Sequence, residues 1–180
     1  MNFRRVIVGL TSLFFLAIPA NGSDNYIEFD PLDYIFEGVS LVVKRSSTFN
    51  NKLTIGVGYF NIKLPDFEND KGVEGEVTNG YELHLDYHFT HPDKGSYTGL
   101  LLIPKEWKIQ RNGMSTKYKT IGVVWRYGYI WRPWNSGFYI NPWIGVIYEK
   151  KASGKNVVDG ETYDIPEPPV IGLIYLGYSF

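Results

Sequence analysis

The chain has no cysteine, and this absence excludes disulfide frameworks, thiolate metal sites, thiol catalysis and the lipidated cysteine of a bacterial lipoprotein. It also lacks an excess of one charge, because 18 basic and 19 acidic residues give a net charge of −1. A nucleic-acid-binding surface is therefore not indicated. A mean hydropathy of −0.18 excludes a membrane protein built from several apolar helices of about 20 residues. Aromatic residues are plentiful instead, with 14 Tyr, 11 Phe and 5 Trp in 180 residues.

The first 22 residues have the organisation of a secretory signal peptide. Arg4 and Arg5 precede an apolar stretch over residues 6–18, and small residues at 20–22 suit a cleavage site. The apolar stretch is too short to span a bilayer core of roughly 30 Å as a helix. We therefore expect residues 1–22 to be removed on export through the secretory pathway, leaving one domain over residues 23–180.

The rest of the chain alternates between apolar and polar residues with a period of two, which is typical of β-strands. In residues 81–89 every odd position is apolar or aromatic and every even one is ionisable. Because bacterial single-chain membrane barrels have an even number of strands, we count the short alternating segment 26–30 as the first. We expect strands over residues 26–30, 38–46, 51–63, 78–91, 96–109, 116–132, 136–150 and 169–180.

The two faces of these strands leave two kinds of barrel open. A soluble barrel turns its apolar face inward, whereas an eight-stranded membrane barrel turns it toward lipid and keeps a narrow polar lumen. Glycines on the polar face, such as Gly56 and Gly122, favour the cramped interior of the membrane barrel. Charges taken out of water need partners, and we expect cations from Lys52, Lys119 and Arg126. The predicted lumen residues are Glu82, His84, Asp86, His88 and Arg126.

The end of the chain favours the membrane barrel. The last strand ends on Phe180, with Ile174, Leu176 and Tyr178 at alternating positions before it. Together with the signal peptide, this pattern resembles the C-terminal assembly signal of Gram-negative outer-membrane proteins. The chain is similar in architecture to small barrels of the OmpA or OmpW type. This resemblance implies an all-β, up-and-down antiparallel transmembrane barrel of eight strands, integral to the outer membrane of a diderm bacterium. A periplasmic β-sandwich that ends in Phe is the alternative.

A periplasmic C-terminus assigns every connection to a side of the membrane. The short turns at 46–50, 92–95 and 133–135 become periplasmic, and the connections 31–37, 64–77, 110–115 and 151–168 become outer loops. We also expect aromatic girdles at both interfaces. The periplasmic girdle would be Phe89, Tyr97, Tyr129, Trp131, Trp134, Phe138, Tyr178 and Phe180. The outer girdle would be Tyr59, Tyr81, Trp107, Tyr118 and Tyr148.

The histidines offer little support for metal or catalytic chemistry. On a strand, His84 and His88 are roughly 13 Å apart at about 3.3 Å per residue, so they need ligands from other strands to share a metal ion. Small outer-membrane barrels include lipid A-modifying enzymes, which makes such an enzyme the alternative to weigh. The deacylase type places His and Ser two residues apart near the C-terminal end, but the last histidine here is His91. We expect no catalytic residue, metal or cofactor.

The sequence therefore predicts a structural or surface-interaction role. The expected partners are outer-membrane lipid, lipopolysaccharide and the barrel assembly machinery, with an extracellular ligand on the outer loops as a further candidate and no nucleic acid. A narrow channel for small molecules is the alternative. An eight-stranded interior is just wide enough for side chains, so passage would need an opening in the wall. Pro104 and Pro142 are candidates for it, because proline interrupts strand hydrogen bonding.

Overall fold

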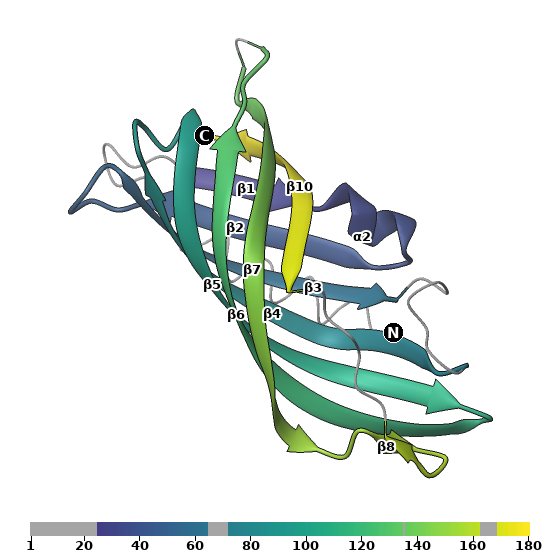
Figure 1. The fold of residues 1–180 in the computed structure, drawn as a ribbon. Helices are drawn as coiled ribbons and strands as arrows, with labels where there is room; N and C mark the ends of the chain where they lie inside the picture. The colour runs from purple at the N-terminus through teal and green to yellow at the C-terminus, as the bar shows by residue number, and fades with distance from the viewer. Residues whose placement is uncertain (1–24, 65–71, 135, 163–168) are drawn as a thin grey trace.

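The computed structural model describes residues 25–64, 72–134, 136–162 and 169–180, so the predicted signal peptide lies outside the described residues. These residues form a closed barrel in the ring order β1-β10-β7-β6-β5-β4-β3-β2, with every neighbouring pair antiparallel (Figure 1). The predicted eight-stranded, up-and-down barrel is confirmed. Its strands are β1 (Asn25–Phe29), β2 (Val39–Ser46), β3 (Leu53–Lys63), β4 (Glu74–His88), β5 (Gly95–Arg111), β6 (Met114–Ile130), β7 (Phe138–Gly154) and β10 (Val170–Ser179).

The two ends of the barrel differ in their connections. At one end, here called the turn end, β2–β3, β4–β5 and β6–β7 are joined by short segments. The barrel closes there, because Asn25 and Phe180 exchange two backbone hydrogen bonds of 3.0 Å. The opposite end, here called the loop end, carries the connections that were predicted to be outer loops.

Two of the predicted loops are shorter in the structure. β5 and β6 are joined by Asn112 and Gly113 alone, with φ of 47° and 78°. Positive φ at both positions is the geometry of a type I′ hairpin turn, which Asn-Gly favours. The predicted loop 110–115 is therefore too long. The predicted loop 64–77 is also too long, because β4 already begins at Glu74.

The register around the ring is staggered. Following paired residues from Ile27 through β2, β3, β4, β5 and β6 leads to Tyr148 on β7. Going the other way, through β10, leads to Phe138, ten residues away on the same strand. This offset is the shear of the barrel, and it makes the strands run at an angle to the barrel axis.

The wall is much taller on one side than on the other. β5, β6 and β7 have 17 residues each, whereas β1 has five. Beyond β1 the chain enters the short helix α2 (Pro31–Ile35), which lies next to β2 and β10 (Figure 1). Its N-cap is Asp30, whose side chain accepts a 2.8 Å hydrogen bond from the backbone of Leu32, and Pro31 suits the first helical turn.

A second local element lies at the loop end, where β8 (Val157–Val158) and β9 (Glu161–Thr162) form a hairpin apart from the ring. Val158 packs into an apolar cluster with Trp107 and Tyr118 from the tall side of the wall. Helix α2 in the predicted loop 31–37 and the β8–β9 hairpin in the predicted loop 151–168 were not expected from the sequence.

The two prolines do not open the wall. Beside Pro104 the β4–β5 pairing is interrupted and then resumes in the same register, and Pro142 pairs with Ile174 of β10. The predicted opening at these prolines is therefore wrong, since each removes one hydrogen-bond donor without displacing its strand. The bulge in this region lies on β4, between Val77 and Asn79.

Exposed apolar side chains surround the barrel between its two ends. On β6, outward-facing residues from Ile121 to Tyr129 alternate with buried ones. Other members of this apolar belt are Val57, Leu83, Leu85, Leu100, Leu102, Ile144, Val146, Val170 and Ile174. An outward apolar band that alternates with an inward face is typical of a membrane barrel. No helix in the described part of the chain is long and apolar enough to cross a bilayer.

Three predicted girdle aromatics point inward rather than outward. Tyr97, Trp107 and Tyr118 are between 0% and 5% exposed, so the prediction is wrong for them. On β5, the unbroken apolar run over residues 100–103 obscures the alternation in the sequence, although Tyr97 and Trp107 share the parity of the buried Leu101. The remaining predicted girdle residues are exposed, except Tyr59, which is half-buried. Of these, Trp131, Trp134 and Phe138 form part of an aromatic rim at the turn end.

Candidate functional site

A group of charged side chains crosses the interior of the barrel. Nη2 of Arg126, on β6, lies 2.8 Å from both carboxylate oxygens of Asp86, on β4. Both side chains are almost completely buried. The rings of Tyr97 and Trp143 pack on the guanidinium at 5.3 Å, a favourable cation–π distance. Gly99 of β5 lies between the two strands, and a Cβ at that position would stand only 2.0 Å from Asp86 Oδ1, so a larger residue there would displace the Asp86 carboxylate.

Lys44 on β2 and Glu28 on β1 extend this group across the barrel. Lys44 Nζ lies 2.6 Å from Glu28 Oε2 and 3.3 Å from Asp86 Oδ2. The other carboxylate oxygen of Glu28 accepts hydrogen bonds from Tyr139 Oη at 3.0 Å and from Asn141 Nδ2 at 2.8 Å. Each buried charge thus faces an opposite charge, which is what a buried ion requires.

His84 joins Glu82 to the guanidinium. Its Nδ1 lies 2.8 Å from Arg126 Nη2, and its Nε2 lies 2.7 Å from Glu82 Oε2. Because a guanidinium only donates hydrogen bonds, Nδ1 must accept, and the ring proton is on Nε2 and is donated to Glu82. The imidazole is neutral in this arrangement, since a second proton on Nδ1 would point at the guanidinium. Tyr175 Oη on β10 lies 3.5 Å from the other oxygen of Glu82.

These side chains lie buried in the middle of the barrel. We call them the charged network: Glu28, Lys44, Glu82, His84, Asp86 and Arg126. A cavity beside it, lined by Glu28, Lys44, Asp86 and Tyr139 among others, has a volume of about 10 Å³. That is room for about one water molecule. The described side chains therefore leave only a water-sized void at this place.

Four of the five predicted lumen residues belong to the charged network. The fifth, His88, is buried beside it, with Nε2 3.2 Å from Thr54 Oγ1. Two of the predicted cationic partners are wrong. Lys52 donates to the backbone oxygen of Phe89, and Lys119 lies on the exposed outer face of the wall.

Glu28 and Lys44 are the members that sequence reasoning missed. Glu28 alternates with Tyr26 in the short first strand, and Lys44 follows Ser40 and Val42 on the inward face of β2. Their strand parity is a signal that could have found them, because both strands continue the same polar face.

The described residues contain no constellation for metal or triad chemistry. No group of three His, Asp or Glu side chains among them is placed to hold a metal ion. The nearest approach to a nucleophile pair is Thr54 with His88. Nδ1 of that histidine has no hydrogen-bond partner, whereas a catalytic triad needs a third group to orient the ring.

Toward the loop end the interior holds a second buried ion pair, Lys105 with Glu149 at 2.5 Å, and beside it a group of apolar side chains. We call the four side chains Phe60, Ile147, Ile171 and Leu173 the apolar recess. They pack against a fully buried cluster that includes Trp143, but they themselves are only half-buried. Leu173 lies two residues beyond Tyr175, and Tyr175 contacts the charged network. The recess therefore adjoins the network on its loop-end side.

Asp33 and Glu37 lie on and just after α2, outside the eight strands, and their surroundings shift their pKa values in opposite directions. Burial and the neighbouring Asp30 carboxylate raise the pKa of Asp33 to about 7. A hydrogen bond from Lys63 holds the pKa of Glu37 below its ordinary value.

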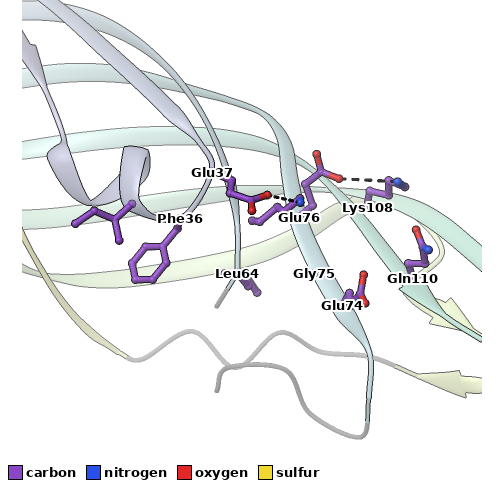
Figure 2. A pocket seen from close by; sticks show the side chains of 10 residues that line it. Phe36, Glu37, Leu64, Glu74, Gly75, Glu76, Lys108 and Gln110 are labelled. Carbon is purple, nitrogen blue, oxygen red and sulfur yellow. Dashed lines mark hydrogen bonds and ion pairs between the residues drawn. The ribbon is translucent and has the colours of Figure 1, made fainter. Parts of the chain in front are cut away.

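A pocket of about 370 Å³ lies beside the end of α2 (Figure 2). Figure 2 shows Glu76 and Lys108 facing each other on adjacent strands, 3.9 Å apart, and Glu37 pairs with Lys63 on the other side. Four of the five charged side chains that line this pocket thus pair with one another. Its lining is Ile35, Phe36, Glu37, Lys63, Leu64, Glu74, Gly75, Glu76, Lys108 and Gln110.

The residues of the predicted assembly signal lie on the outer face of β10 and at its end. Ile174, Tyr178 and Phe180 are between 43% and 52% exposed, and Leu176 is half-buried. They share the outward parity of the apolar belt.

No protein-family model and no curated protein matches the chain. Among solved structures, it is similar to the N-terminal β-barrel domain of Pseudomonas aeruginosa OprF, with 12% identity and a TM-score of 0.52, covering 89% of this chain and 98% of that domain. It is also similar to Neisserial surface protein A (NspA), with 15% identity and a TM-score of 0.47, covering 87% and 92% of the two chains.

At these identities the likeness concerns the fold. With the closed ring of eight antiparallel strands, it shows that the chain has the fold of the small eight-stranded outer-membrane β-barrels of OmpA-like type.

Proposed function

We propose that this protein is an integral outer-membrane β-barrel with a structural or surface-interaction role. The observation that carries the proposal is the contrast between its two faces. The outward face is an apolar belt, with side chains such as Trp125 63% exposed, whereas Asp86 and Arg126 are 1% exposed. Water on the outside would reverse this preference, whereas lipid on the outside explains it.

The proposed orientation places the turn end in the periplasm and the loop end outside the cell. Three of the four loop-end connections are longer than any connection at the turn end, the two-residue β5–β6 turn being the exception, and this difference supports the orientation. In this orientation, outer-membrane lipid and lipopolysaccharide surround the apolar belt. Ile174, Leu176, Tyr178 and Phe180 would be recognised by the barrel assembly machinery on export.

The same interior supports a role without conductance. The charged network connects β1, β2, β4 and β6 across the barrel, which argues against an open pore at neutral pH. We propose no catalytic residue and no cofactor.

Gel mobility tests the membrane placement most simply. Outer-membrane fractions are run in SDS with and without boiling, and we expect the unheated protein to migrate faster because the folded barrel resists the detergent. Recovery in the soluble periplasmic fraction, with one mobility at both temperatures, would overturn the proposal. Asp86→Ala provides a comparison, because a barrel with a broken network should shift at a lower temperature.

Whole-cell binding tests the surface role. The β8–β9 hairpin is the substitution target, because it lies apart from the ring, whereas the residues from Glu74 onward belong to β4. Replacing residues 157–162 by a Gly-Ser linker should lower binding to host-cell or matrix surfaces, while Lys119→Gln on the outer wall serves as the matched control. Unchanged binding would argue against the surface role and leave only the structural role.

A further inference from the structure

The ring of strands is incomplete beside β10. β1 pairs with β10 only between Phe29 and Leu176 at one end and Tyr26 and Ser179 at the other, whereas β7 pairs with β10 as far as Val170. Within the described residues, no strand lies next to the β1-facing edge of β10 from Val170 to Tyr175. Val170 is 51% exposed and belongs to the apolar belt, so the unpaired edge lies within the belt.

Helix α2 takes the place of the missing half of β1 without bonding to β10. The hydrogen bonds of α2 and its C-cap are made to other strands. The Asp33 side chain is hydrogen-bonded to Ser40 on β2, and the backbone oxygen of Phe36 accepts a 3.4 Å hydrogen bond from Lys63 on β3. No hydrogen bond or ion pair joins α2 to β10 in the described part of the chain. Moving α2 away from β10 therefore breaks no ladder hydrogen bond. The helix itself presents exposed apolar side chains, with Ile35 at 69%.

The apolar recess lies on the inner side of this edge. Ile171 and Leu173 point inward from the unpaired part of β10, and Phe60 and Ile147 lie on β3 and β7. β10 is thus apolar on both faces here, although the inward face of a membrane barrel is usually polar. An apolar lining that keeps part of its surface accessible, next to an unpaired edge at belt height, fits an apolar ligand that enters from the side.

We propose that the seam between β10 and α2 admits one acyl chain of a surrounding bilayer lipid into the apolar recess. This inference rests on the proposed membrane placement. The four recess side chains offer no polar group, and Lys105 on the loop-end side is already paired with Glu149. A carboxylate or phosphate would therefore find no partner in the recess, and the headgroup stays at the interface. The charged network bounds the recess toward the turn end and stops the chain from passing further.

Tryptophan fluorescence in brominated lipid tests this inference, because bromine quenches only at short range. The probe is dibrominated phosphatidylcholine, and the protein is the full barrel with Trp143 as its single tryptophan, the other four being replaced by Phe. Trp143 is 5% exposed and packs against the recess. We expect a loss of its fluorescence in brominated bilayers relative to the same lipid without bromine. A second protein, with Trp125 as its single tryptophan, reports on the lipid-facing wall.

Filling the recess separates entry through the seam from quenching through the wall. Ile171→Phe with Leu173→Phe should restore Trp143 fluorescence in brominated lipid, whereas Ile174→Phe, on the outward face of the same strand, should not. If the double variant does not fold, as judged by the loss of heat-modifiable mobility, Ile171→Phe alone is used as the recess-filling variant. Quenching that persists unchanged in the recess-filling variants overturns the inference.

The failures of the two proposals are distinguishable. If Trp125 is not quenched, the membrane placement is wrong. If Trp125 is quenched and Trp143 is not, the recess is empty and only this inference is wrong.

A second copy of the chain that pairs with the free edge of β10 is a further outcome. Gly172→Cys lies on the outward face of the unpaired edge and introduces the only thiol in the chain, so efficient disulfide-linked dimers in bilayers would place a second copy there and contradict the acyl chain.

Discussion

The two parts of the barrel interior solve the same packing problem in opposite ways. The charged network fills its space with ions that pair across the barrel, so that Lys44 reaches Glu28 and Asp86 from a third strand. The apolar recess lies next to it and is only half-buried. The difference follows the wall: strands enclose the network on all sides, whereas the recess adjoins an unpaired strand edge. The four recess side chains carry no charge themselves, and a further buried ion pair, Lys105 with Glu149 at 2.5 Å, lies beside Ile147 on the loop-end side.

The largest expected effect comes from breaking the network. Asp86→Ala leaves the guanidinium of Arg126 and the ammonium of Lys44 without their shared carboxylate, at positions that water cannot reach. Removing one partner of a buried ion pair costs about 3–5 kcal/mol. Urea unfolding of the refolded barrel in lipid vesicles measures this loss. A variant as stable as the parent would show that the ion pairs of the network do not stabilise the barrel.

Two inward-facing glycines compare the tight packing around the network with the roomier interior beside Ile147 and Glu149. A Cβ at Gly99 would lie 2.0 Å from Asp86 Oδ1 and 3.0 Å from the backbone oxygen of Leu85, whereas a Cβ at Gly122 would meet nothing closer than 3.4 Å. We expect Gly99→Ala to destabilise the barrel by about 1–3 kcal/mol and Gly122→Ala to change it by less than about 0.5 kcal/mol. The same urea titration ranks both variants, and equal effects would erase the distinction between tight and roomy parts.

Helix α2 should dock more firmly at low pH. The Asp33 carboxyl, whose pKa is raised to about 7, faces Asp30 and Glu82, and Ser40 is its hydrogen-bonding partner. In the docked state the pKa of Asp33 is about 7, whereas the exposed carboxyl of an undocked helix has the ordinary value of 3.8. The docked state therefore binds the proton more tightly, and docking is favoured most at low pH. It weakens as pH rises from about 4 to about 7, and is constant above.

Backbone amide exchange measures this docking, because the N–H groups of Phe36 and Gly38 are bonded within the α2 turn. After correction for intrinsic rates, their protection should fall between pH 5 and pH 7.5. Asp33→Asn removes the titrating group and should flatten the profile. A profile that is identical in parent and variant would assign the pH dependence to another group.

The smallest effect is expected at the outer rim. Glu37 and Lys63 form a short ion pair, but their side chains are 73% and 59% exposed. Exposed pairs contribute little because water screens them and side-chain entropy opposes them. Glu37→Gln should leave the urea midpoint unchanged within error, and a loss comparable to Asp86→Ala would contradict the role given to burial.

Strand parity explains how much of this arrangement the sequence predicts. Alternation places Glu82, His84, Asp86 and Arg126 on one face, and those four side chains do meet inside the barrel. Which cation they meet depends on register and shear across the ring, which no local pattern contains. Parity alone does place Lys44 on the inward face of β2 and Lys119 on the outward face of β6, but only the register shows that Lys44 reaches Asp86.

Elements whose form depends on tertiary contacts were also missed. Asp30 and Pro31 suit the start of a helix, but no local signal indicates that this one-turn helix replaces half a strand beside β10. The inward position of Tyr97 was missed because its strand runs into four apolar residues without alternation. In both cases the neighbours decide the outcome, and local propensity does not.

Conductance in planar bilayers tests the central claim, that the charged network closes the interior, most directly. The refolded full-length barrel is inserted at neutral pH and recorded under an applied voltage. The structure predicts no single-channel events for the parent protein, since only a water-sized void accompanies the network. Regular, uniform channel openings by the parent protein would contradict a closed interior and favour a narrow channel for small molecules.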